Sequence, residues 1–572
     1  MFVRTKFDAD RNRTRVQIVQ SVRDGQKVRQ RIVRHVGIAT SDLQLDSLRQ
    51  LARVIMEEIR QSASPQQELI APKQYADLLE QGKRERPGRL GVDLGECREE
   101  SRLSVGVREV FGALYTHLGW DRVLGARRMS ANRILKELVL ARLVQPRSKR
   151  GTVLDLSREA GVTLNLDRVY QTLDFLDEDR IESIRQQSCD RARSLFEQPL
   201  EVLFFDTTTL YFESEKEDEG DDQGVRFKGY SKDGKPHRTQ VLLALLVTTD
   251  GLPVGYQVFP GNTYEGHTLT EAIDALRKHY AVETITVVAD AGMLSQDNQA
   301  HLRERKLPYI LGYRLKSGPA ALKRKILDPE GFVPWDGSKG LSKSIQRYKV
   351  LEHDGSRIIV TYSEKRAHKD QHLRTKAIER LHKKLKRSKK PASLVSRGTA
   401  RFLEIPDEGT VQLNPDKIAE AARWDGLRAI LVHGNEDRDP RDLVGQYRQL
   451  WEIEHCFRTN KHDLKIRPIY HWKPRRIRAH LAICYMAFCC LQHLRHRLKA
   501  LGYPMSPEAI RRELNALQLS ILVKKGTQHK FILPSRATAE ARRIYRSVSL
   551  SWDEAPYPIT PVPKKRKASI GS

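Results

Sequence analysis

The chain has 572 residues and a formal net charge of +29, from 101 Lys and Arg against 72 Asp and Glu. This charge makes an extended polyanion such as nucleic acid the expected partner, because each neutralised phosphate releases counterions. Six cysteines in so long a chain exclude a disulfide framework. We find neither a secretory signal nor a run of about 18 uncharged apolar residues, and we therefore expect an intracellular protein with no membrane partner.

Residues 1–66 are predicted to form a β-hairpin followed by a helix. Polar and β-forming residues alternate in two arms, and Asp24-Gly25 is the clearer hairpin turn signal. Leucines and isoleucines then recur at helical spacing from about 43 to 61. The polar stretch that follows indicates a linker over residues 67–99.

Residues 100–198 are predicted to be helical and to bind DNA. The segment TVLDLSREAGVTLNLDRVYQTLDFL has the layout of a helix-turn-helix, with a glycine in its turn. An ordinary helical hairpin would show the same pattern. Neighbouring loops carry basic residues that would suit a DNA-facing surface in either case. These residues are Arg127, Arg128, Arg147, Lys149 and Arg150.

The pattern changes at about residue 201, where EVLFFDTTTLYFES predicts a strand with Asp206 inside its apolar run. A lone buried carboxylate is costly, so Asp206 must be paired or must bind a metal. Two more strands follow, joined by an Asp250-Gly251 turn, and then a helix from about 266 to 279. A continuous apolar strand, typical of a buried parallel strand, ends in Asp290.

Three strands, a helix and a fourth strand predict the first part of an RNase-H-like α/β core over residues 199–314. In that fold the fourth strand lies beside the first, which would bring Asp206 and Asp290 together. Two adjacent carboxylates repel each other unless a cation lies between them. Oxygen ligands with open coordination positions suit Mg²⁺ or Mn²⁺ better than zinc.

A third acidic candidate, Glu454, lies in YRQLWEIEHCFRTNK, which we predict to be one helix from Tyr447 to Lys461. Tyr447, Glu454 and Lys461 fall on one stripe of that helix. An adjoining apolar stripe can anchor the helix on a hydrophobic core. Glu454 could then complete a site for two ions about 3.5 to 4 Å apart. Taken alone, the pattern is also that of an ordinary amphipathic helix with a solvated glutamate.

The motifs FFDTTTLYF and VVADAGMLSQDN, together with the segment 447–461, resemble the Asp, Asp and Glu motifs of bacterial insertion-sequence DDE transposases. The last motif resembles the subgroup with a Tyr-Arg-Glu-Lys pattern. Tyr447, Glu454 and Lys461 match that spacing, whereas Leu450 occupies the Arg position.

This resemblance implies that Asp206, Asp290 and Glu454 are the catalytic and metal-binding residues, with two Mg²⁺ or Mn²⁺ ions per site. Arg448 or Arg458 would supply the charge of the missing arginine. Basic residues become frequent after the glutamate and alternate with aromatic ones, which predicts a surface that holds DNA ends. The predicted DNA-binding residues are Tyr447, Arg448, Arg458, Lys461, Lys465, Arg475 and Arg476.

The interval between Asp290 and Glu454 is too long for a direct connection. Residues 315–440 are therefore predicted to be an insertion, and the resemblance implies that it is β-rich. Residues 441–500 would complete the core, and residues 501–572 would form a C-terminal region with a disordered basic tail. The helix AHLAICYMAFCCLQHLRHRL contains cysteines and histidines, but its apolar character predicts core packing rather than a zinc site.

The sequence therefore predicts a transposase that cuts insertion-sequence ends by two-metal hydrolysis and joins them to target DNA through the freed 3′-hydroxyl. Whether a hairpin forms on the way is left open. We expect it to act on double-stranded DNA as a homodimer, in the bacterial cytoplasm with the nucleoid. The alternatives are another RNase-H-like nuclease, such as a resolvase or RNA-strand hydrolase, and a catalytically inactive DNA-binding protein.

Overall fold

The computed structural model describes most of the chain from residue 94 onward and parts of the N-terminal region. The described ranges are 2–8, 13–24, 27–39, positions within 45–56, 94–194, 202–279, 285–335, 344–387, 400–404 and 411–558, without 222, 233, 436 and 527–529. The predicted linker up to residue 93 and the basic tail from 559 lie outside the described residues.

The chain divides into two compact units. Unit 1 comprises Met1–Leu200, Thr208–Asn262 and His455–Ser572, and unit 2 comprises Glu201–Thr207 and Thr263–Glu454. Each unit is therefore assembled from segments that are distant in the sequence.

In unit 1 the N-terminal arms form an antiparallel sheet of three strands rather than a single hairpin. The strands are β1 (Phe2–Asp8), β2 (Arg13–Asp24) and β3 (Lys27–Ala39), in that order. One face is apolar, and Val16 and Ile18 pack there against the helical residues near Leu48 and Ala52. The face is thus covered by the segment that directly follows the sheet, as its apolar spacing predicts.

A group of helices follows in unit 1, as predicted. The helices are α3 (Gly106–His117), α4 (Met129–Val144), α5 (Lys149–Glu159), α6 (Leu166–Asp174) and α7 (Glu178–Arg193). Side-chain N-caps begin the last three, because Ser148, Asn165 and Asp177 accept hydrogen bonds from first-turn N–H groups. Between α5 and α6 lies Gly161 with φ 64°, so the predicted helix, glycine turn and helix are confirmed.

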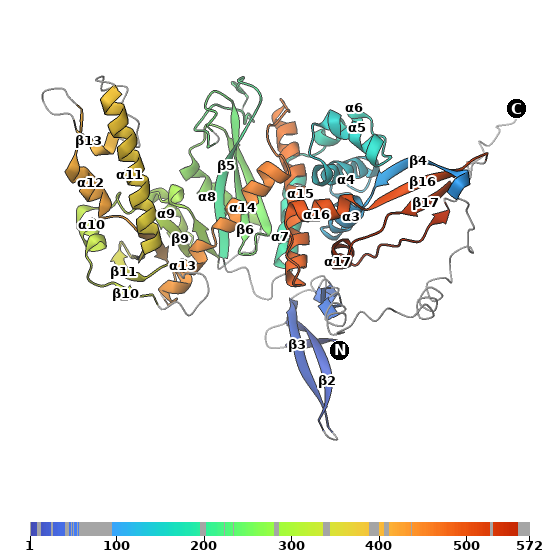
Figure 1. The fold of residues 1–572 in the computed structure, drawn as a ribbon, viewed down its shortest axis with the longest axis horizontal. Coiled ribbons are helices and arrows are strands. Elements are labelled where there is room, and N and C mark those ends of the chain that lie inside the picture. Colours follow the sequence, from blue (N-terminus) through green and yellow to red (C-terminus); the bar gives the residue numbers. More distant parts are fainter. Residues whose placement is uncertain are drawn as a thin grey trace. The chain divides into compact units, whose positions relative to one another are not determined.

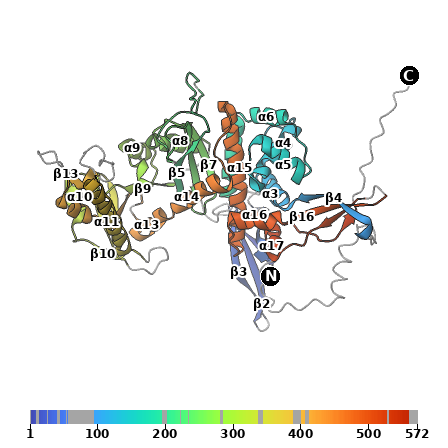
Figure 2. The same cartoon turned by 45° about the horizontal axis from the view of Figure 1, so that its top comes forward.

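The long helix α15 (Pro474–Ala500) is the core of this helical group. Figures 1 and 2 both show it beside α4, and it also packs on α3, α6 and α7. By length and composition it could cross a membrane, but 94% of its most apolar stretch is buried inside the protein. Its cysteines and histidines Cys484, Cys489, Cys490 and His493 are buried in that core, which agrees with the predicted packing role.

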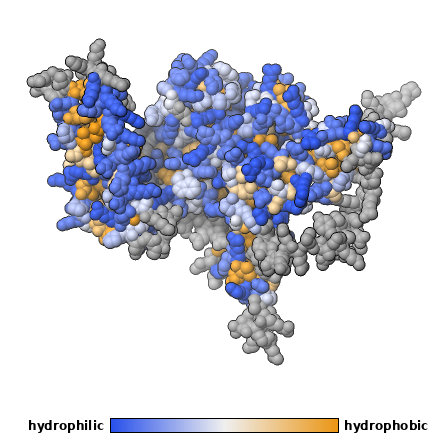
Figure 3. All heavy atoms as spheres, viewed as in Figure 1, coloured by the Kyte–Doolittle hydropathy of each residue, from blue (hydrophilic) through white to orange (hydrophobic). Residues whose placement is uncertain are grey.

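A four-stranded antiparallel sheet in unit 1 joins β4 (Cys97–Ser104) to strands near the C-terminal end of the described chain. Its order is β18-β17-β16-β4, with β4 paired to β16 (Gln518–Lys524). The other members are β17 (Lys530–Pro534) and β18 (Tyr557–Pro558), with α16 (Pro507–Asn515) and α17 (Ala539–Ser547) nearby in sequence. Figure 3 draws one side of the whole molecule, and hydrophilic residues cover most of the surface seen there.

The RNase-H-like core has the predicted strand arrangement. The first strand, β5 (Val202–Tyr211), begins in unit 2 and ends in unit 1. In unit 1 the sheet continues with β6 (Gln240–Thr248) and β7 (Pro253–Pro260), in the order β5-β6-β7. In unit 2, β8 (Thr286–Ala289) pairs in parallel with β5, so the prediction that the fourth strand lies beside the first is confirmed. β9 (Tyr309–Tyr313) then pairs in parallel with β8. The connecting helices are α8 (Thr268–His279) and α9 (Gln296–Glu304).

The predicted insertion extends this same sheet and also contains helices, of which one is long. In unit 2 the strand order continues as β9-β15-β12-β11-β10. These strands are β10 (Val333–Pro334), β11 (Arg347–His353), β12 (Ser356–Tyr362) and β15 (Leu427–His433). The helices are α10 (Ala320–Leu327), the 24-residue α11 (Glu364–Arg387) and α12 (Pro415–Ala422), and a small separate sheet pairs β13 (Leu403–Glu404) with β14 (Gln412–Leu413). The insertion is therefore mixed α/β rather than purely β-rich.

One buried ion pair fixes the loop after β5. Asp218 and Arg226 are both buried, and the Asp218 carboxylate accepts hydrogen bonds from the backbone N–H groups of Val225 and Arg226 and from the Arg226 guanidinium. The guanidinium also lies over the ring of Trp472, 5.2 Å from its centroid. Removing one partner of such a pair leaves a buried charge without compensation.

We therefore predict that Asp218→Ala lowers the free energy of unfolding by about 3 kcal/mol. The exposed neighbour Glu219 offers a matched control, since Glu219→Ala should stay within about 0.5 kcal/mol of the parent. Urea unfolding of both variants measures the difference. Equal stability of the two would show that the pair does not hold this loop.

Candidate active site

The candidate site contains two aspartates that lie on or directly after neighbouring parallel strands. Phe205 of β5 pairs with Ala289 of β8, and Asp206 and Asp290 are the residues that follow directly. Paired strands lie about 4.8 Å apart. The two carboxylates therefore start from adjacent backbone positions, in unit 2.

Backbone N–H groups orient both carboxylates. The N–H of Thr207 donates to Asp206 Oδ1 at 2.7 Å, and the N–H of Gly292 donates to Asp290 Oδ1 at 2.8 Å. Asp290 thereby caps the 3₁₀ turn Ala291–Met293. A Cβ on Gly292 would lie 2.8 Å from Asp290 Oδ1, so the small residue leaves room for the carboxylate.

Tyr447, in α13 (Pro440–Arg448), brings a hydroxyl group to the same place. A Cβ added to Gly312 of β9 would lie 2.4 Å from Tyr447 Oη and 2.8 Å from the backbone nitrogen of Ala291. The phenol thus lies against β9 and close to the peptide that follows Asp290. Glycine is required at this position by the close approach of the hydroxyl, not by backbone conformation.

The pKa of Tyr447 is raised to about 12, mainly by burial and next by the charge of Asp290, against the opposing charge of Arg428. Glu454 and Asp206 add to the same upward shift of the pKa. All three predicted catalytic carboxylates therefore act on one phenol hydroxyl, which is neutral at pH 7 and can donate a hydrogen bond.

Glu454 is exposed, in the first turn of α14 (Trp451–Arg458). Within the described residues, no three His, Cys, Asp or Glu side chains form a ready metal-ligand cluster. The charges of the three carboxylates thus all raise the pKa of Tyr447, but among the described residues the carboxylates do not form a closed ligand cluster. Their donor set is oxygen only, which suits a hard cation such as Mg²⁺ or Mn²⁺ better than zinc.

The prediction of one helix from Tyr447 to Lys461 is wrong. α13 ends at Arg448, α14 begins at Trp451, and a π-helical turn, Thr459–Asp463, follows it. Between the two helices the bonds are of the tighter i to i+3 type, such as Leu450 N–H to the Tyr447 carbonyl at 3.1 Å. The tyrosine and the glutamate therefore lie on separate helices, and the continuous stripe does not exist.

The predicted DNA-binding residues fall into both units. Tyr447 and Arg448 belong to unit 2 with the carboxylates, whereas the others belong to unit 1. In unit 1, Arg458, Lys465 and Arg475 are exposed, and Lys461 is half-buried. The five predicted DNA-binding residues in unit 1 are Arg458, Lys461, Lys465, Arg475 and Arg476.

Arg476 is already engaged in an ion pair. Its Nε and one terminal nitrogen donate to the two oxygens of Asp174 at 2.7 and 2.6 Å, and these bonds lower the pKa of that carboxyl group. The guanidinium also lies 4.9 Å from the centroid of the Tyr170 ring. Arg476 thus joins α15 to α6, and its charge is largely compensated.

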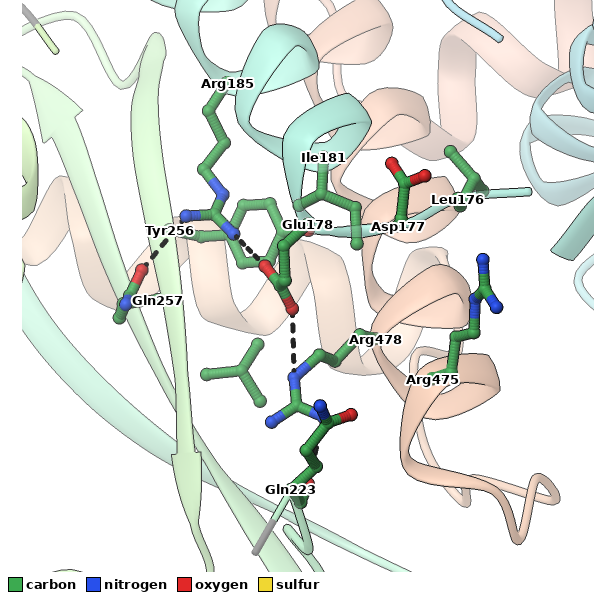
Figure 4. A pocket seen from close by; sticks show the side chains of 11 residues that line it. Leu176, Asp177, Glu178, Ile181, Arg185, Gln223, Tyr256, Gln257, Arg475 and Arg478 are labelled. Carbon is green, nitrogen blue, oxygen red and sulfur yellow. Dashed lines mark hydrogen bonds and ion pairs between the residues drawn. The ribbon is translucent and has the colours of Figure 1, made fainter. Parts of the chain in front are cut away.

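Unit 1 also contains a cavity of about 620 Å³ that the sequence did not reveal (Figure 4). Glu178 of α7 pairs there with Arg185 at 3.4 Å and with Arg478 of α15 at 3.1 Å. Arg185 also donates to the Gln257 side chain and lies over the ring of Tyr256. Two of its basic residues, Arg185 and Arg478, are therefore paired with the same carboxylate, that of Glu178.

Comparisons with known proteins identify the family of the chain. Residues 197–490, more than half of the chain, match the family model for the transposase DDE domain, and residues 3–67 match the model for the N-terminal domain of the IS1634 family of transposases. None of the curated proteins matches the sequence.

Solved structures similar to the chain include the piggyBac transposase in a synaptic complex with hairpin DNA, at 10% identity over 72% of this chain and 79% of that chain, with a TM-score of 0.37. The Mos1 transposase in a paired-end complex with the left transposon end is 13% identical over 32% of this chain and 56% of that chain, with a TM-score of 0.14. On the evidence of the family models, the chain belongs to the DDE transposases of bacterial insertion sequences.

Proposed function

We propose that this transposase cuts the ends of its insertion sequence and joins them to target DNA in a reaction that depends on divalent metal ions. The observation that carries the proposal is the placement of Asp206, in the middle of β5, beside Asp290, directly after the paired parallel strand β8. The charge of Glu454 contributes, with theirs, to the raised pKa of Tyr447. Double-stranded DNA is the substrate, and joining two ends suits a homodimer on DNA in the bacterial cytoplasm.

The three carboxylates would hold two Mg²⁺ or Mn²⁺ ions. Such ions, when bound, activate the attacking oxygen and stabilise the leaving oxygen of a phosphodiester. The protein's own part is to hold the carboxylates in place before the reaction. The N–H groups of Thr207 and Gly292 do this for Asp206 and Asp290, so their orientation need not change during catalysis.

Tyr447 supports the site as a positioning residue. Its raised pKa keeps the phenol protonated at neutral pH, so it acts as a hydrogen-bond donor and not as a base. Its hydroxyl lies close to the backbone of β9 and to the peptide after Asp290. A donor in this place can orient a carboxylate or a phosphate oxygen before the 3′-hydroxyl attacks in line.

Asp206→Asn, Asp290→Asn and Glu454→Gln should each lower the rate of DNA cleavage by about a thousand-fold or more, equivalent to about 4 kcal/mol. DNA affinity should change little, because most of it comes from basic residues elsewhere. Chelation of divalent ions should abolish cleavage by the parent protein. The measurement is cleavage of a labelled duplex that carries the element ends, together with a binding assay.

Asp297 offers the matched control for these variants. It is exposed on α9 in the same unit, so Asp297→Asn removes the same charge away from the site and should cleave normally. Near-normal cutting by any one of the three carboxylate variants would remove that residue from the metal site.

Tyr447→Phe should keep the fold and reduce cleavage about ten-fold, the value of one hydrogen bond of about 1.4 kcal/mol. Gly312→Ala should do the same or worse, because its Cβ would meet the hydroxyl at 2.4 Å. Since the phenol titrates only near pH 12, the cleavage rate of the parent should show no ionisation of Tyr447 between pH 7 and 9. The pH profile of Tyr447→Phe should therefore have the same shape over that range. A tyrosine-dependent rise in rate over that range would show instead that Tyr447 acts as a base.

Lys461→Ala should weaken binding of element ends and strand transfer more than metal binding. Its matched control is Lys216→Ala, because Lys216 lies between Glu215 and Glu217 in an acidic loop unsuited to DNA. End complexes are measured by gel shift and metal binding by Mn²⁺ titration. Unchanged end complexes and rates would exclude Lys461 from the DNA-binding surface.

A further inference from the structure

A second cavity in unit 1, of about 200 Å³, concentrates positive charge. It lies among the end of α4, the start of α5, residues 465–471 and α15. None of the described residues that line it is Asp or Glu. Its lining includes six cations, Arg142, Arg147, Lys149, Arg150, Lys465 and Arg467.

Lys149 is the central observation. Its side chain lines the cavity, yet the residue is only 5% exposed. In the part of the chain that the structure describes, its ammonium group has no hydrogen-bond or ion-pair partner. Burial, followed by repulsion from Arg142, lowers the pKa of Lys149 to about 7. A buried cation without a counter-charge is costly, and an anion in the cavity would remove that cost.

The start of α5 faces the same cavity. Lys149 is the first residue of this 11-residue helix, and Ser148 caps it by accepting a hydrogen bond from the N–H of Gly151 at 3.2 Å. Among the described residues, the N–H groups of Lys149 and Arg150 have no acceptor. Helix N-termini bind anions through such N–H groups and through the helix dipole.

Neighbouring histidines are subject to the same positive charge. The pKa of His471 is lowered to about 3, mainly by burial and next by repulsion from Lys149 and Arg476. Burial likewise moves the pKa of His480 well below its ordinary value, again with repulsion from Lys149. The cavity of Figure 4 differs, because its lining contains carboxylates and Glu178 pairs with two of its arginines, Arg185 and Arg478.

We propose that this cavity binds one phosphodiester group of the DNA backbone, held by the Lys149 ammonium and by the first N–H groups of α5. The proposal rests on the proposed function, because it takes DNA as the substrate. It assigns the loop between α4 and α5 a definite contact with DNA. Lys465, one of the predicted DNA-binding residues, lies on the same cavity.

The test compares full-length Lys149→Gln with Lys216→Gln, which removes the same charge from the acidic loop. Affinity for a mixed-sequence duplex is measured at several salt concentrations. For Lys149→Gln we expect weaker binding and a slope of log affinity against log salt that is smaller by about one. Separately, inorganic phosphate replaces chloride at constant ionic strength, and it should raise the melting temperature of the parent and of Lys216→Gln more than that of Lys149→Gln.

Affinity and slope equal to those of Lys216→Gln would overturn the proposal. A phosphate response that depends on Lys149 without any effect on DNA binding would mean a site for a free anion, and would also overturn it. If Lys149→Gln does not fold, Arg150→Gln provides the same comparison, because Arg150 is exposed on the same cavity. Asp206→Asn should keep the parent slope, so failure of this proposal is distinguishable from failure of the metal site.

Discussion

The parallel pairing of β5 with β8 is the constraint on which the active site depends. Every residue of β8 is buried, and Asp206 is a half-buried residue within an otherwise almost wholly buried stretch of β5. A slip of one residue would turn the apolar side chains of β5 to the opposite face and would separate Asp206 from Asp290. The packing of the strands therefore fixes the register in which β5 pairs with β8. That register sets the positions of the Asp206 and Asp290 carboxylates.

The insertion explains how the segment that carries Tyr447 and Glu454 returns to these strands. Its strands do not form a separate body, because β15 pairs with β9 next to β8. α13 begins soon after β15, so the chain is already back at the core when it reaches Tyr447. Contact of its hydroxyl with the backbone of Gly312 then places α13 against the site, and Glu454 follows on the next helix.

Much of the core could be predicted because its signals are local. The apolar runs around Asp206 and before Asp290 indicate strands, and their order along the chain predicts which strands pair. The break between α13 and α14 could not be predicted, because neither Gly nor Pro marks Gln449 and Leu450 and tertiary packing decides the turn.

Contacts between residues that are distant in the sequence could not be predicted either. Arg476 was predicted to contact DNA from local charge alone, but its carboxylate partner, Asp174, lies 302 residues away. The sequence marked Lys149 as basic and close to a loop, and gave no sign that it is buried without a counter-charge. Local composition thus identified the charged regions, while the fold determines which charges remain uncompensated.

The pairing of β4 with β16 has a consequence for synthesis. β4 leaves the ribosome early, but its partner lies some four hundred residues downstream, so the strand has no neighbour on that side until translation is almost complete. A product truncated before β16 would keep the carboxylate motifs while leaving an open strand edge that invites aggregation. Premature stop codons late in the gene should therefore silence the element as effectively as changes to its catalytic residues.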